Sequence, residues 1–92
     1  MPLTPRERSF LKARAHALEP TVTVGQGGLT DSVLREIDRA LTAHELIKVR
    51  AAGDDREARR ALLEAIGART GAEAVQHVGK VFVLWRPRPL EE

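Results

Sequence analysis

The sequence predicts a compact α/β sandwich in which three helices and four strands follow the order α-β-α-β-α-β-β. Apolar residues recur at helical spacing in three segments, and each segment follows a residue that can cap a helix. Short β-branched or alternating segments follow these helices and end at glycine or proline. Strands joined through helices should pair in parallel with right-handed crossovers, so a terminal hairpin makes a mixed sheet.

The first helix is predicted to begin at Thr4, with Pro5 in its first turn and Glu7 completing a capping box. It should end before Pro20, because the residue preceding a proline is pushed out of the helical region. Its apolar stripe is expected to contain four residues: Phe10, Leu11, Ala15 and Leu18.

The middle of the chain is predicted to hold a strand over 21–24, a helix over 31–45 and a strand over 46–51. Alternation in the second strand places Lys48 and Arg50 on one face of the sheet, beside Leu46. The cations could contact a ligand there, or could serve only to solubilise a half-exposed strand.

The last third is predicted to contain a helix capped by Asp54, followed by two strands within 72–86 that join at Gly79-Lys80. The segment 81–85 is apolar on both faces. It should therefore be a central, well-covered strand.

The composition indicates one soluble domain, here placed at residues 1–88 with a short tail at 89–92. The 92 residues are 42% hydrophobic and 30% charged, and no cysteine is present to form a disulfide or a thiolate metal site. No apolar run approaches a membrane span, and the N-terminus does not resemble a signal peptide. These observations predict a cytoplasmic protein.

The net charge of +2 is small but unevenly distributed. Residues 1–18 contain four cations and one acid, residues 80–88 contain three cations and no acid, and Lys48 and Arg50 add two more. Such patches suit a polyanion, although solvated surface charge explains them equally well.

The segment Gly25-Gln-Gly-Gly28 fits the pattern GxxG and runs from a predicted strand into a helix that Thr30 should cap. Glycines let a backbone approach a ligand closely, and free N–H groups at a helix start bind anions such as phosphate. A tight structural turn is the equally weighted alternative. A P-loop would need Lys-Ser or Lys-Thr after the last glycine, and a dinucleotide fingerprint would need glycine at position 30. The sequence has Leu29-Thr30 instead, so neither nucleotide-binding motif fits.

No pattern indicates an enzyme. His16, His44 and His77 stand on three different elements without metal-ligand spacing, and no nucleophile accompanies them, so we expect no catalytic residue, metal or cofactor. An enzyme that acts on phosphate esters would need metal ligands and a general base, and the sequence shows a pattern for neither. Because only three aromatic residues occur, a sheet that stacks several bases is excluded, and any nucleic acid would have to be bound mainly through backbone, glycine loop and cations.

Taken together, the sequence resembles the YhbY-type CRM domain (chloroplast RNA splicing and ribosome maturation) over nearly its whole length. The resemblance is carried by ordered segments: Leu11-Lys12, Ala15-His16, Leu18–Pro20, Val24–Thr30, His44–Val49, Gly71, Gly79-Lys80 and Leu84–Pro87.

The resemblance implies a fold similar to the C-terminal domain of bacterial translation initiation factor three, and RNA binding without catalysis. It further implies the stand-alone bacterial type, associated with precursors of the large ribosomal subunit, acting as a monomer without a membrane or small-molecule partner. The site residues expected to bind RNA are Gly25, Gln26, Gly27, Gly28, Thr30, Lys12, Arg14, Lys48, Arg50 and Lys80. The alternative is an adaptor that docks on ribosomal proteins or assembly factors through a face containing Phe82 and Leu84.

Overall fold

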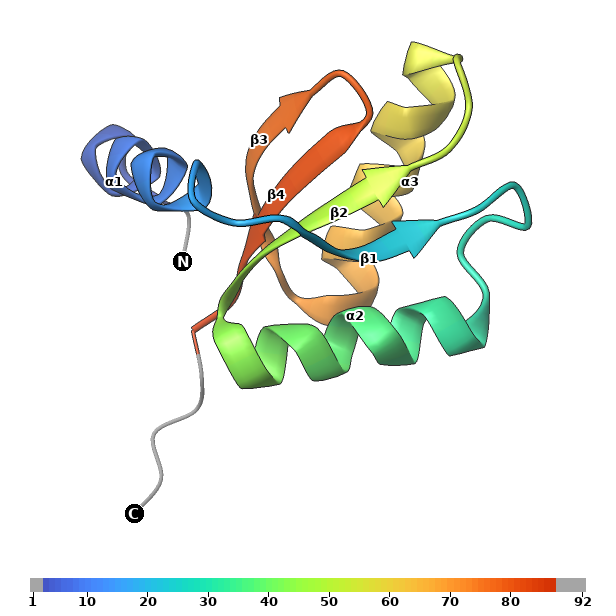
Figure 1. The fold of residues 1–92 in the computed structure, drawn as a ribbon, viewed down its shortest axis with the longest axis horizontal. Helices are drawn as coiled ribbons and strands as arrows, with labels where there is room; N and C mark the ends of the chain where they lie inside the picture. Colours follow the sequence, from blue (N-terminus) through green and yellow to red (C-terminus); the bar gives the residue numbers. More distant parts are fainter. Residues whose placement is uncertain (1–2, 88–92) are drawn as a thin grey trace.

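The computed structural model describes residues 3–87 and contains the predicted elements in the predicted order (Figure 1). The predicted tail at 89–92 lies outside the described residues. The elements are α1 (Pro5–Ala15), β1 (Pro20–Val24), α2 (Asp31–His44), β2 (Leu46–Ala51), α3 (Arg56–Thr70), β3 (Glu73–Val78) and β4 (Val81–Trp85).

The four strands form one mixed sheet in the order β1-β2-β4-β3. β1 and β2 are parallel and are joined through α2, whereas β4 is antiparallel to both of its neighbours. The prediction that β4 is a central strand is therefore confirmed.

Helices α2 and α3 cover one face of the sheet, where the larger core forms. Its buried residues are Val22, Val24, Ile37, Ala40, Leu41, Ile47, Val49, Ala51, Ile66, Ala72, Phe82 and Leu84. Phe82 and Leu84 are both 0% exposed, so the expected adaptor surface through these residues is wrong. Both side chains pack in the larger core beneath the helices, so neither offers a surface to a partner.

Helix α1 covers part of the opposite face through a smaller core that contains Leu11, Ala15, Leu46, Val75 and Val83. The capping box predicted at its start is present, and hydrogen bonds from Thr4 hold the pKa of Glu7 below its ordinary value. The helix ends at Ala15, earlier than predicted, because the next amides bond three residues back and tighten the chain into a turn.

The predicted apolar stripe of α1 is correct for Leu11 and Ala15. It is wrong for Phe10, which is 62% exposed, and for Leu18, which lies beyond the end of the helix and is 37% exposed. Leu11 and Ala15 are four residues apart and share one face of the helix, whereas Phe10 lies about a quarter turn away. This face of the sheet is covered by one short helix, and within residues 3–87 no second helix lies beside α1 against which Phe10 could pack.

The start of α3 differs from the prediction by one residue. Asp55, and not Asp54, is the N-cap, and its Oδ1 accepts hydrogen bonds from the amides of Glu57 and Ala58 at 3.0 and 3.3 Å. Adjacent aspartates are equivalent caps by sequence, and the path of the preceding loop selects between them. Asp54 is thereby released for a different contact.

Arg86 ties the end of β4 to both helices of the larger core. Its Nη1 donates to Asp38 Oδ1 at 2.7 Å and to the Thr70 carbonyl at 2.8 Å. Its Nη2 donates to the Asp38 carbonyl and to Thr42 Oγ1, both at 3.0 Å. One planar guanidinium thus joins β4 to a carbonyl in the middle of α2 and to the carbonyl of the last residue of α3.

We expect Arg86→Ala to lower the free energy of unfolding by about 2 kcal/mol, since charge-assisted hydrogen bonds are lost and the Thr70 carbonyl at the end of α3 loses this donor. Arg86→Lys should recover only part of this stability because an ammonium cannot reproduce the fork. Urea unfolding followed by circular dichroism measures the difference. The exposed Arg60→Ala is the matched control, and an equal loss in both variants would contradict the role of Arg86.

Candidate nucleic-acid interface

The glycine loop is a closed turn between β1 and α2, with the Gly28 amide donating to the Gly25 carbonyl at 3.0 Å. Only Gly28 has a positive φ, of 77°, so only this glycine is required by its own backbone conformation. A Cβ atom built at Gly25 or Gly27 would meet nothing within 4 Å. The turn itself therefore explains one of the three glycines and leaves the other two without a structural reason.

Thr30 caps α2 as predicted, with its Oγ1 accepting from the Val33 amide at 3.2 Å. Its own amide donates to the Gly28 carbonyl at 3.0 Å. Of the four amides that a helix start leaves unpaired, those of Asp31 and Ser32 are consequently the donors open to an anion. The Asp31 carboxylate lies in the same turn and opposes that anion with negative charge.

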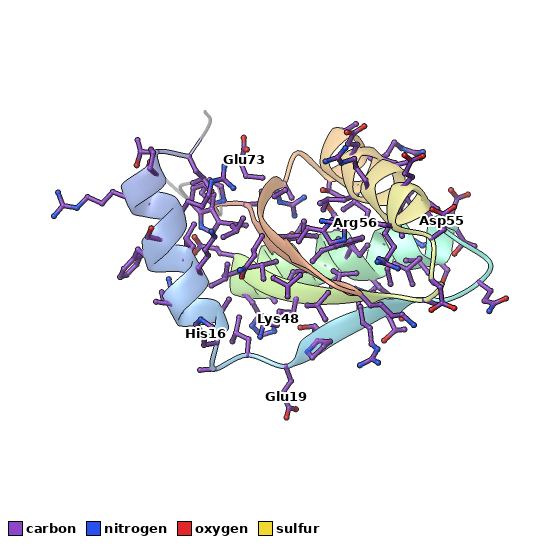
Figure 2. The ribbon with its side chains drawn as sticks, turned by 90° about the horizontal axis from the view of Figure 1, so that it is seen from above. His16, Glu19, Lys48, Asp55, Arg56 and Glu73 are labelled. Atoms are coloured by element: carbon purple, nitrogen blue, oxygen red, sulfur yellow. The ribbon has the colours of Figure 1, made fainter. Side chains whose placement is uncertain are left out.

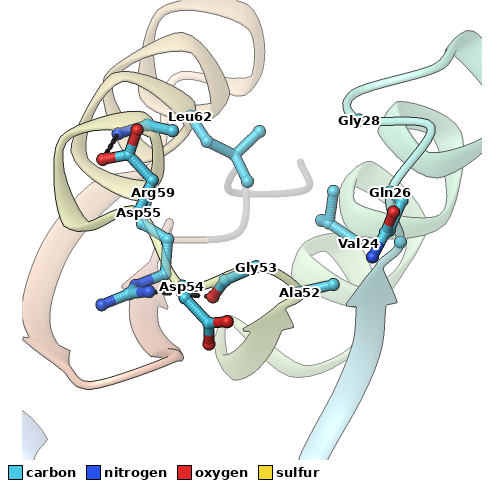
Figure 3. A pocket seen from close by; sticks show the side chains of 11 residues that line it. Val24, Gln26, Gly28, Ala52, Gly53, Asp54, Asp55, Arg59 and Leu62 are labelled. Carbon is cyan, nitrogen blue, oxygen red and sulfur yellow. Dashed lines mark hydrogen bonds between the residues drawn. The ribbon is translucent and has the colours of Figure 1, made fainter.

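A pocket of about 420 Å³ lies between the glycine loop and the segment that leads into α3 (Figure 3). Val24 and Gln26 stand on one wall, and Asp55, Arg59 and Leu62 stand opposite. Arg59 Nη1 donates to the Gly53 carbonyl at 2.9 Å, while its buried Nε has no hydrogen-bond partner. Sequence reasoning missed this wall, because no spacing rule places residues 52–62 beside residues 24–28.

Lys80 reaches the same end of the sheet but is not a free cation. Its Nζ lies 3.0 Å from Asp54 Oδ1, and the hydrogen bond and charge of Lys80 hold the pKa of Asp54 below its ordinary value. The pairing follows from the fold, since the Ala51 amide donates to the Lys80 carbonyl at 2.7 Å and fixes the hairpin beside the end of β2.

Lys48 and Arg50 share one face of the sheet with Leu46, as predicted, and the structure shows that α1 partly covers this face. Lys48 pairs in register with Pro20 and Val83, and Arg50 pairs with Thr23 and Val81, so no cross-strand neighbour opposes either charge. Lys48 Nζ donates to the Leu18 carbonyl at 3.1 Å, close to the end of α1 that carries His16 (Figure 2). Arg50 is exposed.

Lys12 and Arg14 stand on α1, which packs on the part of the sheet that contains Leu46 and Trp85. The glycine loop lies at the opposite end, where β1 and β2 finish (Figure 1). The predicted site residues are therefore not one cluster. They extend from α1, along β2, to the glycine loop of a molecule whose longest dimension is 38 Å.

Most of the predicted RNA-binding cations take no part in a salt bridge. Within residues 3–87, the ion pairs are Lys80–Asp54 and Arg86–Asp38, so Lys12, Arg14, Lys48 and Arg50 face no carboxylate within 4.0 Å. In the same part of the chain, no three potential metal ligands lie together, and no helix is long and apolar enough to span a membrane.

Comparison with known proteins gives a consistent family. The model of the CRS1/YhbY (CRM) domain matches residues 3–86. An RNA-binding protein of Haemophilus influenzae is 48% identical over 85 residues, covering 92% of this chain and 86% of the relative. A protein of Pseudomonas aeruginosa, named a probable RNA-binding protein, is 42% identical over 89 residues, covering 97% and 86%.

The fold also matches a solved structure. The solution structure of a hypothetical protein from Staphylococcus aureus superposes with a TM-score of 0.84 at 29% identity, covering 98% of this chain and 94% of that one. The architecture of three helices and a four-stranded mixed sheet is thus a compact α/β domain of known type. The chain belongs to the CRS1/YhbY (CRM) domain family.

We expect Lys80→Ala to raise the pKa of Asp54 towards its ordinary value, since both the hydrogen bond and the opposite charge are removed. In the native protein the depressed pKa contributes stability above the unfolded pKa of Asp54, and that stability is lost as pH falls through the folded pKa. Carboxyl ¹³C NMR titration reads the change directly. Lys12→Ala is the control, and an unchanged Asp54 pKa in Lys80→Ala would show that the ion pair is absent in solution.

Proposed function

We propose that this protein binds RNA, and specifically ribosomal RNA in precursors of the large ribosomal subunit. Its relatives are named as RNA-binding proteins, and the resemblance to the stand-alone bacterial CRM type points to the ribosomal target. In this proposal the protein acts as a cytoplasmic monomer and performs no catalysis.

The observation that carries the proposal is the unexplained pair Gly25 and Gly27. Neither has a positive φ, and a side chain at either position would enter open space. Folding therefore does not require glycine there, whereas close approach of a ligand to the loop backbone does. An RNA phosphate at the loop would accept hydrogen bonds from backbone amides of the turn and of the start of α2.

The cations on β2 and α1 extend this contact over the sheet. Lys48 and Arg50 project from one face and have uncharged cross-strand neighbours. A polyanion lying along β2 would meet these cations without displacing an internal ion pair. Contacts of this kind hold the backbone and carry little sequence information, so recognition should depend chiefly on RNA shape.

Lys80 contributes only if RNA competes for it. An exposed ion pair such as Lys80–Asp54 contributes little to stability, because water and salt screen its charges. A phosphate near the loop can offset this small loss by taking the ammonium as its own partner. In this proposal Lys80 contacts RNA only after it has left Asp54, whereas Lys48 and Arg50 can contact RNA without breaking an ion pair.

We expect Gly27→Asp to weaken binding of large-subunit ribosomal RNA fragments by at least about tenfold, since a carboxylate would face the bound phosphate. Gly27→Asn has almost the same volume without the charge and should retain more affinity. Both variants should fold normally because the site is open, which circular dichroism verifies. Equal affinity of wild type and Gly27→Asp would mean that the loop does not touch RNA. Gly28 is a poorer test position, because its positive φ makes any substitution strained.

We expect the double variant Lys48→Ala/Arg50→Ala to flatten the salt dependence of RNA binding. Each lost phosphate contact reduces the slope of log affinity against log salt by about 0.7 on single strands, so two contacts should reduce it by about 1.4. A filter-binding or anisotropy titration across a salt series measures this slope. Arg60→Ala on α3, which covers the other face, should leave it unchanged; identical slopes in both variants would remove β2 from the interface.

A further inference from the structure

Helix α1 presents a cationic and aromatic stripe that its packing role does not explain. Arg6, Phe10 and Arg14 stand four residues apart and therefore share one face of the helix. All three are exposed, Phe10 by 62%. The Arg14 guanidinium carbon lies 5.9 Å from the centre of the Phe10 ring, within the range of a cation–π contact.

Among the aromatic side chains of residues 3–87, that of Phe10 is the most exposed. Phe82 is completely buried in the larger core, and Trp85 is partly buried against the smaller one. The buried face of α1 is formed by Leu11 and Ala15, so Phe10 adds nothing to the core. An aromatic ring flanked on both sides by arginine is the chemistry on which an unpaired nucleobase stacks.

The stripe is continuous with the cations on the sheet. A hollow of about 360 Å³ is lined by Arg14, Leu18, Thr21, His44 and Leu46. Arg14 belongs to the stripe, and the carbonyl of Leu18 accepts the hydrogen bond from Lys48. A chain that follows β2 towards α1 would pass this hollow directly before it reaches Phe10.

We propose that the Arg6–Phe10–Arg14 face of α1 binds an unpaired nucleotide of the RNA, with its base stacked on Phe10 and its phosphates held by the two arginines. This inference rests on the proposed function and specifies its ligand: the RNA must be single-stranded where it crosses α1. Charge decides the occupant, because the stripe contains two arginines and no acid, and no ion pair within residues 3–87 uses either arginine.

The test is a double-mutant cycle between the ring and the base. The probe is a single-stranded RNA from the large-subunit ribosomal sequence, prepared intact and with one abasic site moved along it position by position. Phe10→Leu keeps an apolar side chain but removes the aromatic face, and Phe10→Trp keeps a stacking ring. Both substitutions are at an exposed site, and circular dichroism checks that the fold is unchanged.

At one position, we expect the abasic site to weaken binding by wild type about 5-fold to 100-fold, the effect of losing one base–aromatic stack. Phe10→Leu should bind the intact and abasic RNAs equally, and Phe10→Trp should retain the difference. A fully paired duplex should show no dependence on Phe10.

Two failures are distinguishable. If wild type binds none of the RNAs, the proposed function and this inference are both overturned. If wild type binds and Gly27→Asp lowers affinity, but Phe10→Leu responds to abasic sites as wild type does, only the stacking site is overturned. In that case the α1 stripe serves another partner, such as an acidic protein surface, or solvent alone.

Discussion

Burial of the central β2–β4 pair on both faces is the constraint on which the rest of this structure depends. Ile47, Val49, Phe82 and Leu84 point towards α2 and α3, while Leu46 and Val83 point towards α1. Truncating a buried aromatic such as Phe82 typically costs about 3–5 kcal/mol, a large part of the stability of a small domain. The helices are therefore committed to this pair, and the strand ends, the part of the sheet face beyond α1 and the outer face of α1 remain for function.

The shortness of α1 follows from the same constraint and leaves room for the interface. Its 11 residues cover Leu46, Val75 and Val83, and the sheet face beyond them holds Lys48 and Arg50. Two cations on a strand would be costly under a helix, because burying an unpaired charge is strongly unfavourable. The part of this sheet face that α1 leaves uncovered keeps the two cations in contact with water. It also leaves them accessible to a polyanion.

Charge near the glycine loop is more balanced than on the sheet. Asp31, Asp54 and Asp55 stand around the loop and its pocket, with Lys80 and Arg59 as their counterparts. A phosphate bound there would depend on backbone amides and short-range geometry, because the local charge is not strongly positive. Lys48 and Arg50 on the sheet would supply the longer-range attraction. The glycine loop and these cations are therefore expected to contribute differently to affinity and to its salt dependence.

Local sequence rules predict the order of elements, the mixed sheet, the central position of β4, the cap at Thr30 and the shared face of Lys48 and Arg50. These features follow from local propensity, capping chemistry and the two-residue period of a strand, all of which act over a few neighbouring residues. The choice of Asp55 as the cap of α3, the exposure of Phe10, the full burial of Phe82 and Leu84 and the pairing of Asp54 with Lys80 became known from the structure. Those outcomes depend on where distant segments meet, and segments far apart in the sequence are brought into contact by packing and not by spacing.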